Sequence, residues 1–198
     1  MSGTVIIDSG GANLASLQYA FERLGVSAEV SSNVHEIASA DRIVLPGVGS
    51  AADAMRRLHS ADIVSLLPTL KQPVLGICLG MQLLFESSEE GSTSCIGVIP
   101  DTVRRLQPAP GFPVPHMGWN QLATLRDDPL LEGVKDGEYV YFVHSFAAPV
   151  SAVTLATADY GSPLSAVVRR DNFWGAQFHP ERSAATGARI LANFLRFT

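Results

Sequence analysis

Short apolar runs alternate with stretches of helical spacing through the first half of the chain. The strand-like runs are "TVIIDSG" (4–10), "SAEVS" (27–31), "RIVLPG" (42–47) and "PVLGI" (73–77). Apolar residues recur at helical intervals in "NLASLQYAFERLG" (13–25), and helices are also expected near 50–59 and 62–71. Strands that alternate with helices form a mostly parallel sheet covered by helices, so this half predicts an α/β fold.

The second half has a different pattern, rich in strand-like runs that Pro, Gly and Asp-Asn interrupt. These runs are "IGVIPDTVRRL" (96–106), "GEYVYFVHSFAAP" (137–149), "AVTLATA" (152–158) and "PLSAVVRRDNFWGAQFHPE" (163–181). An amphipathic helix is expected at 184–197. No linker separates the halves, so we expect a single domain, residues 1–198, whose parallel sheet is extended by β-rich antiparallel strands.

Composition narrows the classes of function. The chain is 46% hydrophobic, with a mean hydropathy of +0.19 and a formal charge of -5. The negative charge and the absence of basic runs argue against nucleic-acid binding. The apolar runs are shorter than the roughly 18 residues of a membrane-spanning helix, and the opening "MSGTVIIDSGG" is not a secretory signal. We therefore expect a cytoplasmic protein whose cysteines, Cys78 and Cys95, are free thiols.

Cys78 stands in the middle of the apolar run "PVLGICLGMQLLF" (73–85). A strand over 74–77 that turns into a helix over 79–86 would display this residue at the carboxyl edge of the sheet, where ligands bind. Gly-x-Cys-x-Gly has the logic of a nucleophile elbow, and a helix N-terminus favours a thiolate. A buried structural cysteine fits the local pattern equally well.

A cysteine nucleophile needs a base and a group that orients the base. His179 follows a strand-like run, and Glu181 comes two residues later, beyond Pro180. In an extended chain, residues two apart share a face, so the carboxylate would orient the imidazole. The alternative is a His-Pro turn beside a surface glutamate.

"GICLGMQ" (76–82) followed by "QFHPERS" (177–183) resembles the class I (triad-type) glutamine amidotransferases, and the resemblance spans nearly the whole chain. It implies Cys78 as the nucleophile, His179 as the general base and then acid, and Glu181 as the orienting carboxylate. It also implies an oxyanion hole at Val48, Gly49 and Leu79, and glutamine binding by Gln82, His144 and Ser145.

Further segments resemble one branch of this family, whose members pass ammonia to a (β/α)₈-barrel cyclase in histidine biosynthesis. They include "LPGVGSAADAM" (45–55), "PHMGWN" (115–120) and "YVYFVHSF" (139–146). This likeness implies a heterodimer with such a cyclase subunit. The residues implied at the partner interface or the ammonia exit are Asn13, Met117, Trp119, Asn120, Tyr139 and Arg182, the last standing where a lysine is usual.

Two other functions stay open on the sequence: a stand-alone γ-glutamyl hydrolase and a non-catalytic regulatory subunit. No metal site is expected, because the His and Cys residues lack the close spacing of ligand sets. No cofactor is expected either, since "DSGGAN" (8–13) lacks the lysine and the glycine spacing of a nucleotide loop.

Overall fold

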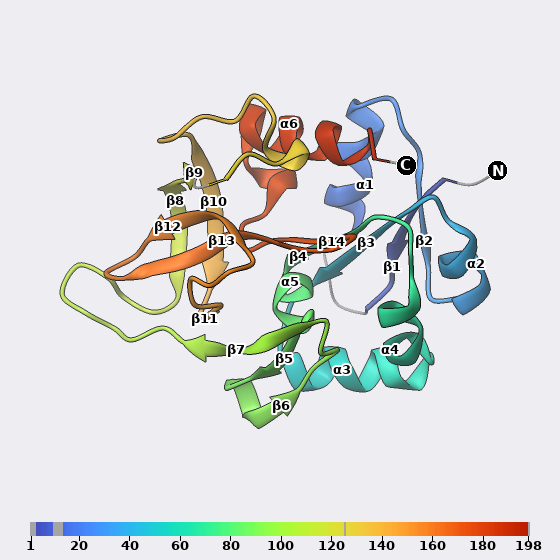
Figure 1. Cartoon of the computed structure of the whole chain (residues 1–198), viewed down its shortest axis with the longest axis horizontal. Coiled ribbons are helices and arrows are strands. Elements are labelled where there is room, and N and C mark those ends of the chain that lie inside the picture. Colours follow the sequence, from blue (N-terminus) through green and yellow to red (C-terminus); the bar gives the residue numbers. More distant parts are fainter. Residues whose placement is uncertain (1–2, 10–13, 125, 198) are drawn as a thin grey trace.

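The protein is organised around an eight-stranded sheet, seen in a computed structural model that describes residues 3–9, 14–124 and 126–197 (Figure 1). The strand order is β2-β1-β3-β4-β14-β13-β12-β9. The first five of these strands are parallel: β2 (Ala28–Ser31), β1 (Thr4–Ile7), β3 (Arg42–Gly47), β4 (Val74–Cys78) and β14 (Phe173–Ala176). The predicted parallel sheet is therefore confirmed.

Antiparallel strands continue the same sheet beyond β14. They are β13 (Pro163–Arg170), β12 (Thr154–Asp159) and the short β9 (Ala123–Thr124). The α/β class with a β-rich antiparallel extension is confirmed by this arrangement.

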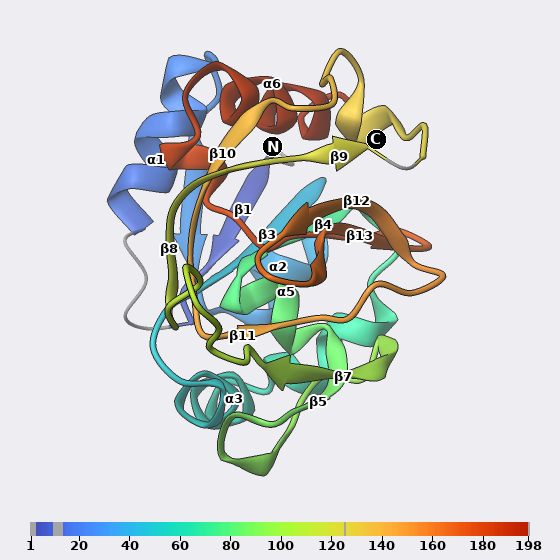
Figure 2. The same cartoon turned by 90° about the vertical axis from the view of Figure 1, so that its left-hand side faces the viewer.

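Two smaller sheets stand beside the large one. One pairs β8 (His116–Gln121) with β10 (Tyr139–His144) in antiparallel register. The other joins β11 (Phe146–Ala147), β7 (Ile99–Arg105), β5 (Phe85–Ser88) and β6 (Thr93–Ser94). Figure 2 shows β8 and β10 along one edge of the molecule, next to α1 and α6.

Helices cover both faces of the parallel strands, because successive side chains of a strand point to opposite faces. On one face, α1 (Leu14–Arg23) and α6 (Ala184–Phe194) pack on Ile6, Val44 and Leu75. On the other, α2 (Val34–Ser39), α3 (Ala51–Ser60) and α4 (Ile63–Leu66) pack on Val5, Ile43 and Leu45. Four short 3₁₀ segments complete the described elements: η1 (Leu67–Thr69), η2 (Glu90–Ser92), η3 (Pro129–Leu131) and η4 (Pro180–Arg182).

One predicted helix is much shorter in the structure. The expected helix over 79–86 is α5 (Leu79–Leu83), and strand β5 begins at Phe85. Leu83, Leu84 and Phe85 are all fully buried. Three consecutive apolar residues do not fit one face of a helix, and pairing of β5 with β7 buries them instead. Within the described ranges, no helix is long and apolar enough to span a membrane.

Candidate active site

Cys78 is held on a strained turn between β4 and α5. Its backbone has φ +53° and ψ −112°, a conformation that non-glycine residues rarely adopt, at a cost of about 1–3 kcal/mol. The residue is 7% exposed, and its Sγ lies 3.7 Å from the carbonyl oxygen of Val143, to which the thiol donates. This geometry is that of a nucleophile elbow.

The glycines on either side of Cys78 allow a close approach of two backbones. A Cβ on Gly80 would lie 1.8 Å from the carbonyl oxygen of Leu45, and a Cβ on Gly76 would lie 2.7 Å from the carbonyl oxygen of Gly80. Neither glycine has a positive φ within the described chain. Their function is therefore to seat α5 directly against β3 and β4, and the unusual φ falls on Cys78 itself.

His179 and Glu181 meet at the end of the chain segment that follows β14. His179 Nδ1 lies 2.8 Å from Glu181 Oε1, and both side chains are about nine-tenths buried. The expectation of an extended chain between them is wrong, because Pro180–Arg182 forms the 3₁₀ segment η4. The 3₁₀ turn folds Glu181 back towards His179, so the predicted pair forms, but through a turn and not through an extended segment.

Ser183 fixes this turn, and sequence reasoning had not singled it out. Its buried hydroxyl donates to the carbonyl oxygen of His179 at 2.6 Å and accepts from the N–H of Tyr141 at 2.9 Å. The N–H of His179 also bonds to the carbonyl oxygen of Tyr141 at 2.9 Å. The turn that carries His179 and Glu181 is thus attached to β10, the strand that ends at His144.

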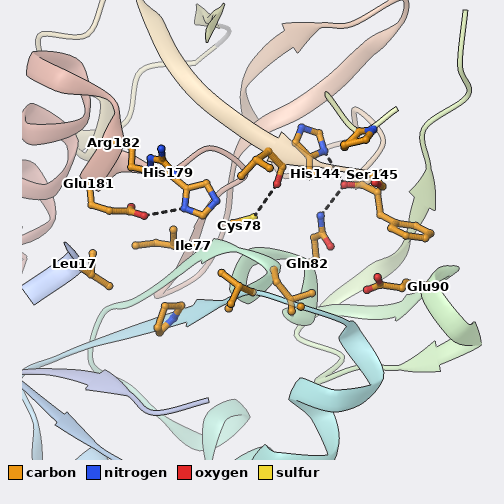
Figure 3. A pocket seen from close by; sticks show the side chains of 18 residues that line it. Leu17, Ile77, Cys78, Gln82, Glu90, His144, Ser145, His179, Glu181 and Arg182 are labelled. Atoms are coloured by element: carbon orange, nitrogen blue, oxygen red, sulfur yellow. Dashed lines mark hydrogen bonds and ion pairs between the residues drawn. The ribbon is translucent and has the colours of Figure 1, made fainter. Parts of the chain in front are cut away.

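The second nitrogen of His179 faces Cys78 (Figure 3). Burial lowers the pKa of His179, but the sulfur of Cys78 and the carboxylate of Glu181 outweigh it and raise the pKa from 6.5 to about 10. Nε2 is buried and has no hydrogen-bond partner in the described structure. Cys78 nevertheless has the largest raising effect on the pKa, because its sulfur lies close enough to favour the protonated imidazole.

A cavity of about 410 Å³ opens over Cys78 and collects most of the predicted site residues (Figure 3). Its lining includes the predicted triad Cys78, His179 and Glu181, the predicted oxyanion residues Val48, Gly49 and Leu79, and the predicted substrate residues Gln82, His144 and Ser145, with Arg182 at the edge. The structure therefore brings together residues that lie more than one hundred positions apart in the chain.

The loop after β3 lies opposite Cys78, because Gly47 pairs in register with Cys78. Gly49 has φ +87° and open space where a Cβ would stand. Gly47 is packed instead, since a Cβ there would come within 2.9 Å of the Leu79 side chain. The peptide between Val48 and Gly49 can therefore rotate, because Gly49 has no Cβ and tolerates both positive and negative φ.

Gln82 and His144 carry their hydrogen bonds inside the protein. Gln82 Nε2 donates to the carbonyl oxygen of Phe146 at 2.7 Å and to Gln177 Oε1 at 3.0 Å. His144 Nδ1 lies 2.9 Å from the same Phe146 oxygen, and its Nε2 lies 3.0 Å from Nδ1 of His116. Both ring nitrogens of His144 are engaged, which leaves the main chain near Ser145 to contact a substrate.

Glu90 is a further lining residue of this cavity, and no role for it was predicted. Its Oε2 accepts a 2.7 Å hydrogen bond from the N–H of Ala51 at the start of α3. A carboxylate held this way is suited to an ammonium group. It was missed because the contact that fixes Glu90 spans 39 residues, a relation that no local pattern reveals.

The residues expected at the partner interface divide between two faces of the β8–β10 pair. Met117, Trp119 and Tyr139 are exposed by 62%, 52% and 55%. Arg182 lies near them, with its guanidinium 4.6 Å from the ring centre of Tyr141. Asn120 differs, because its amide lies 3.4 Å from His116 Nε2 and donates to the carbonyl oxygen of Asp159. Asn13 lies outside the described residues.

The second cysteine takes no part in this site. Burial, together with the nearby charge of Glu90, raises the pKa of the Cys95 thiol to about 11. Both cysteines are free, as expected. Among the described residues, no group of three or more His, Cys, Asp or Glu side chains is placed to hold a metal ion.

The pocket combines a cysteine on a nucleophile elbow, a His-Glu pair and a glycine of positive φ in the facing loop. These features are typical of enzymes that hydrolyse amides through a cysteine, and comparison with known families supports that class. Residues 5–197 match the family described as glutamine amidotransferase class-I. The chain belongs to this family and is a glutamine amidotransferase.

Its similar relatives are more specific. The chain is 53% identical over 198 residues to the imidazole glycerol phosphate synthase subunit HisH of Xanthomonas campestris pv. campestris (strain 8004), covering 100% of this chain and 99% of the relative. It is 52% identical over 195 residues to the protein of the same name from Xylella fastidiosa (strain Temecula1 / ATCC 700964), covering 98% of each.

Solved structures share the fold at low identity. A glutamine amidotransferase structure aligns with a TM-score of 0.76 at 17% identity, covering 98% of this chain and 97% of that one. The PurLQS structure from Thermotoga maritima aligns with a TM-score of 0.70 at 20% identity, covering 98% of this chain and 98% of that one.

Proposed function

We propose that this chain is the glutaminase subunit of an imidazole glycerol phosphate synthase and acts in histidine biosynthesis. Its full-length likeness to subunits of that name supports the assignment. The observation that carries the chemistry is the strained Cys78 turn, which opens into the same cavity as the His179–Glu181 pair. A regulatory subunit without catalysis would have no use for this arrangement.

The first half-reaction forms a thioester. The thiol of Cys78 gives its proton to His179, its sulfur attacks the side-chain carboxamide carbon of glutamine, and the charge on the oxygen is held by N–H groups at Leu79 and at the Val48–Gly49 loop. His179 gives a proton to the amide nitrogen, the C–N bond breaks and ammonia leaves. Glu181 keeps the imidazole in orientation and stabilises its cation through the 2.8 Å contact.

The second half-reaction restores the enzyme. A water molecule gives a proton to His179 and attacks the thioester carbon; the C–S bond then breaks, His179 passes the proton to the sulfur, and glutamate leaves. The substrate's ammonium group would contact the carboxylate of Glu90, and its carboxylate would contact the main chain near Ser145. Charges at both ends then hold the side-chain amide over Cys78.

Ammonia released into water becomes protonated and stops being a nucleophile, so a second site must receive it directly. We infer that this site belongs to a (β/α)₈-barrel cyclase subunit that docks on the exposed face formed by Met117, Trp119 and Tyr139. The cyclase would use ammonia to make imidazole glycerol phosphate and an aminoimidazole carboxamide ribotide. The 198 residues would then form a single amidotransferase domain of a cytoplasmic heterodimer.

The test compares two nitrogen sources in the complex of this chain with its cyclase partner. Cys78→Ala should abolish product formation from glutamine and leave product formation from added ammonia within about twofold of the wild type, because only the first route needs the thiol. Cys95→Ala is the matched control and should leave both routes unchanged. Glutamine-dependent product from Cys78→Ala would overturn the proposal.

Glutamine hydrolysis by this chain without its partner distinguishes the proposed subunit from the remaining alternative. A stand-alone γ-glutamyl hydrolase would hydrolyse its substrate at full rate without a partner. For the proposed subunit, glutamine hydrolysis should rise when the cyclase and its ligand are added, as the peptide before Gly49 turns to complete the oxyanion hole. Equal rates with and without the partner would contradict this gating.

A further inference from the structure

His116 is buried behind the glutamine pocket and does not line it. Its imidazole lies between two aromatic rings, with ring centres 3.9 Å from Tyr160 and 4.7 Å from Phe142, both nearly parallel to it. Burial lowers the pKa of His116 to about 4. The side chain is therefore a neutral imidazole at neutral pH, and glutamine hydrolysis as proposed makes no use of it.

The hydrogen bonds around His116 determine which ring nitrogen carries the hydrogen in His116 and in His144. The carbonyl oxygen of Phe146 only accepts, so His144 Nδ1 must carry a hydrogen and donate to it. Burial, followed by the effect of His116, lowers the pKa of His144 to about 3, which leaves its ring neutral and its Nε2 an acceptor. His116 Nδ1, 3.0 Å away, must then be the donor to His144 Nε2.

The far side of His116 agrees with this assignment. Its Nε2 carries no hydrogen and faces the amide nitrogen of Asn120, a donor, at 3.4 Å. The same amide donates to the carbonyl oxygen of Asp159 at 2.8 Å, and the hydroxyl of Tyr160 donates to the carbonyl oxygen of Pro113 at 2.7 Å. The β12–β13 turn thus holds His116 in place from outside the pocket.

On the side of His144, this series of hydrogen bonds reaches the glutamine pocket. The Phe146 oxygen that accepts from His144 also accepts from Gln82 Nε2 at 2.7 Å. Phe146, His144 and Gln82 all line the cavity over Cys78. Two donors converge on this one oxygen, and the orientation of one of them depends on the hydrogen that His116 supplies.

We propose that His116 is a positioning residue for glutamine binding, which acts by donating to His144 and thereby fixing the Phe146 carbonyl and the Gln82 amide. The inference rests on the proposed glutaminase function. If His116 could not donate, His144 Nε2 would be left without a partner, and His144 would no longer be held in the tautomer that donates to Phe146.

Two substitutions separate the hydrogen-bond donor from the ring. His116→Phe keeps a flat ring between Phe142 and Tyr160 but cannot donate. His116→Asn loses the ring but places an N–H donor near the position of Nδ1. In the complex with the cyclase subunit, H116F should raise the KM for glutamine roughly tenfold with kcat changed less than twofold, the loss that one buried hydrogen bond represents. H116N should keep the KM within about threefold.

A binding measurement supports the kinetics. In a Cys78→Ala background, calorimetric titration with glutamine should give a Kd raised roughly tenfold by H116F and restored by H116N. Urea unfolding of the two variants serves as the folding control, and both should unfold in a single cooperative transition, as the Cys78→Ala parent does.

The outcomes are distinct from failure of the proposed function. No glutamine hydrolysis by the wild-type complex would refute the glutaminase assignment itself. Hydrolysis by the wild type, with an H116F KM equal to the wild-type value, would overturn the positioning role. A KM raised as much in H116N as in H116F would also overturn it, because ring packing would then explain the effect.

Discussion

At the scale of single residues, the site depends on backbone strain at Cys78 and on charge at His179. Cys78 keeps φ +53° although it has a Cβ, and close packing of α5 on β3 prevents the turn from relaxing. This strain lowers the stability of the fold, and it is the consequence of holding the Cys78 side chain on the turn. At His179, by contrast, the neighbouring groups are stabilising, because Cys78 and Glu181 favour the charged form of the imidazole.

The strain predicts that the protein is more stable when position 78 has no side chain. Relative to Cys78→Ala, Cys78→Gly should be more stable by about 1 kcal/mol, since relief of an unfavourable φ/ψ exceeds the entropy that glycine loses on folding. Both variants lack the thiol, so the pair isolates the backbone effect. Urea unfolding of the two proteins measures it, and a Gly variant less stable than the Ala variant would argue against strain at this turn.

The charge at His179 predicts a pH-dependent effect of Glu181→Gln. The folded pKa of His179 is raised above its unfolded value, so the associated stability is fully present below about pH 6.5 and is lost as the pH rises through about 10. Glu181→Gln should destabilise the protein by about 1–3 kcal/mol at pH 6 and by clearly less above pH 10. Unfolding free energies at the two pH values test this, and an equal loss at both would contradict it.

At the scale of elements, two close contacts determine where the functional groups lie. Helix α5 is pressed onto β3 at Gly80, and the turn η4 is fastened to β10 through Ser183. The first contact places Cys78, and the second places His179 beside it. Both contacts join segments that are distant in sequence.

The contact at Gly80 gives a direct prediction. Gly80→Ala would place a Cβ 1.8 Å from the carbonyl oxygen of Leu45, which belongs to a central strand and has little room to move. We expect a loss of at least about 3 kcal/mol in unfolding free energy. Gly3→Ala is the matched control and should change stability by less than about 0.5 kcal/mol, because nothing lies within 4 Å of its added Cβ. A well-folded, equally stable G80A protein would refute this packing.

The sequence predicted elements well where the pattern was long and failed where distant contacts decide. Strand β3 has the predicted bounds, 42–47, because an apolar run flanked by polar residues defines it. The helix expected over 79–86 ends at Leu83, since pairing with β7 draws Phe85 into a strand. The short helix α2 was not predicted, because its one buried residue, Ile37, gives no helical period.

The candidate site shows the same division. Cys78, His179 and Glu181 were identified from local motifs, although the extended geometry expected for the last two is a 3₁₀ turn. No role was predicted for Glu90, nor for His116, although His116 lies within "PHMGWN" (115–120). Their places depend on hydrogen bonds to Ala51 and His144, which only the folded chain brings near.

At the scale of the whole molecule, strand alternation in the β8–β10 pair gives two different surfaces. The inner face carries the buried side chains of His116, Phe142 and His144, of which His144 lines the cavity over Cys78, while the outer face exposes Met117, Trp119 and Tyr139. The strand pair β8–β10, seen in Figure 2, therefore lies between the cavity over Cys78 and the surface proposed for the partner.

The exposed face predicts a loss of association without a loss of fold. Trp119→Ala should weaken binding of the cyclase subunit by about 2 kcal/mol, roughly thirtyfold in Kd, because aromatic anchors dominate such interfaces. Val150→Ala, an exposed apolar residue between β11 and β12, is the control and should leave the Kd unchanged. Calorimetry measures both, and an unaltered Kd for W119A would exclude this face as the centre of the interface.

The central claim is that Cys78 forms a covalent bond with the acyl group of glutamine. Rapid acid quenching of the complex during turnover, followed by mass spectrometry of the peptide that contains both cysteines, tests it most directly. We predict a γ-glutamyl group on Cys78, none on Cys95, and none in the Cys78→Ala protein. Glutamate production by the wild type with a γ-glutamyl group on any other residue, or with the same turnover after Cys78→Ala, would contradict the account.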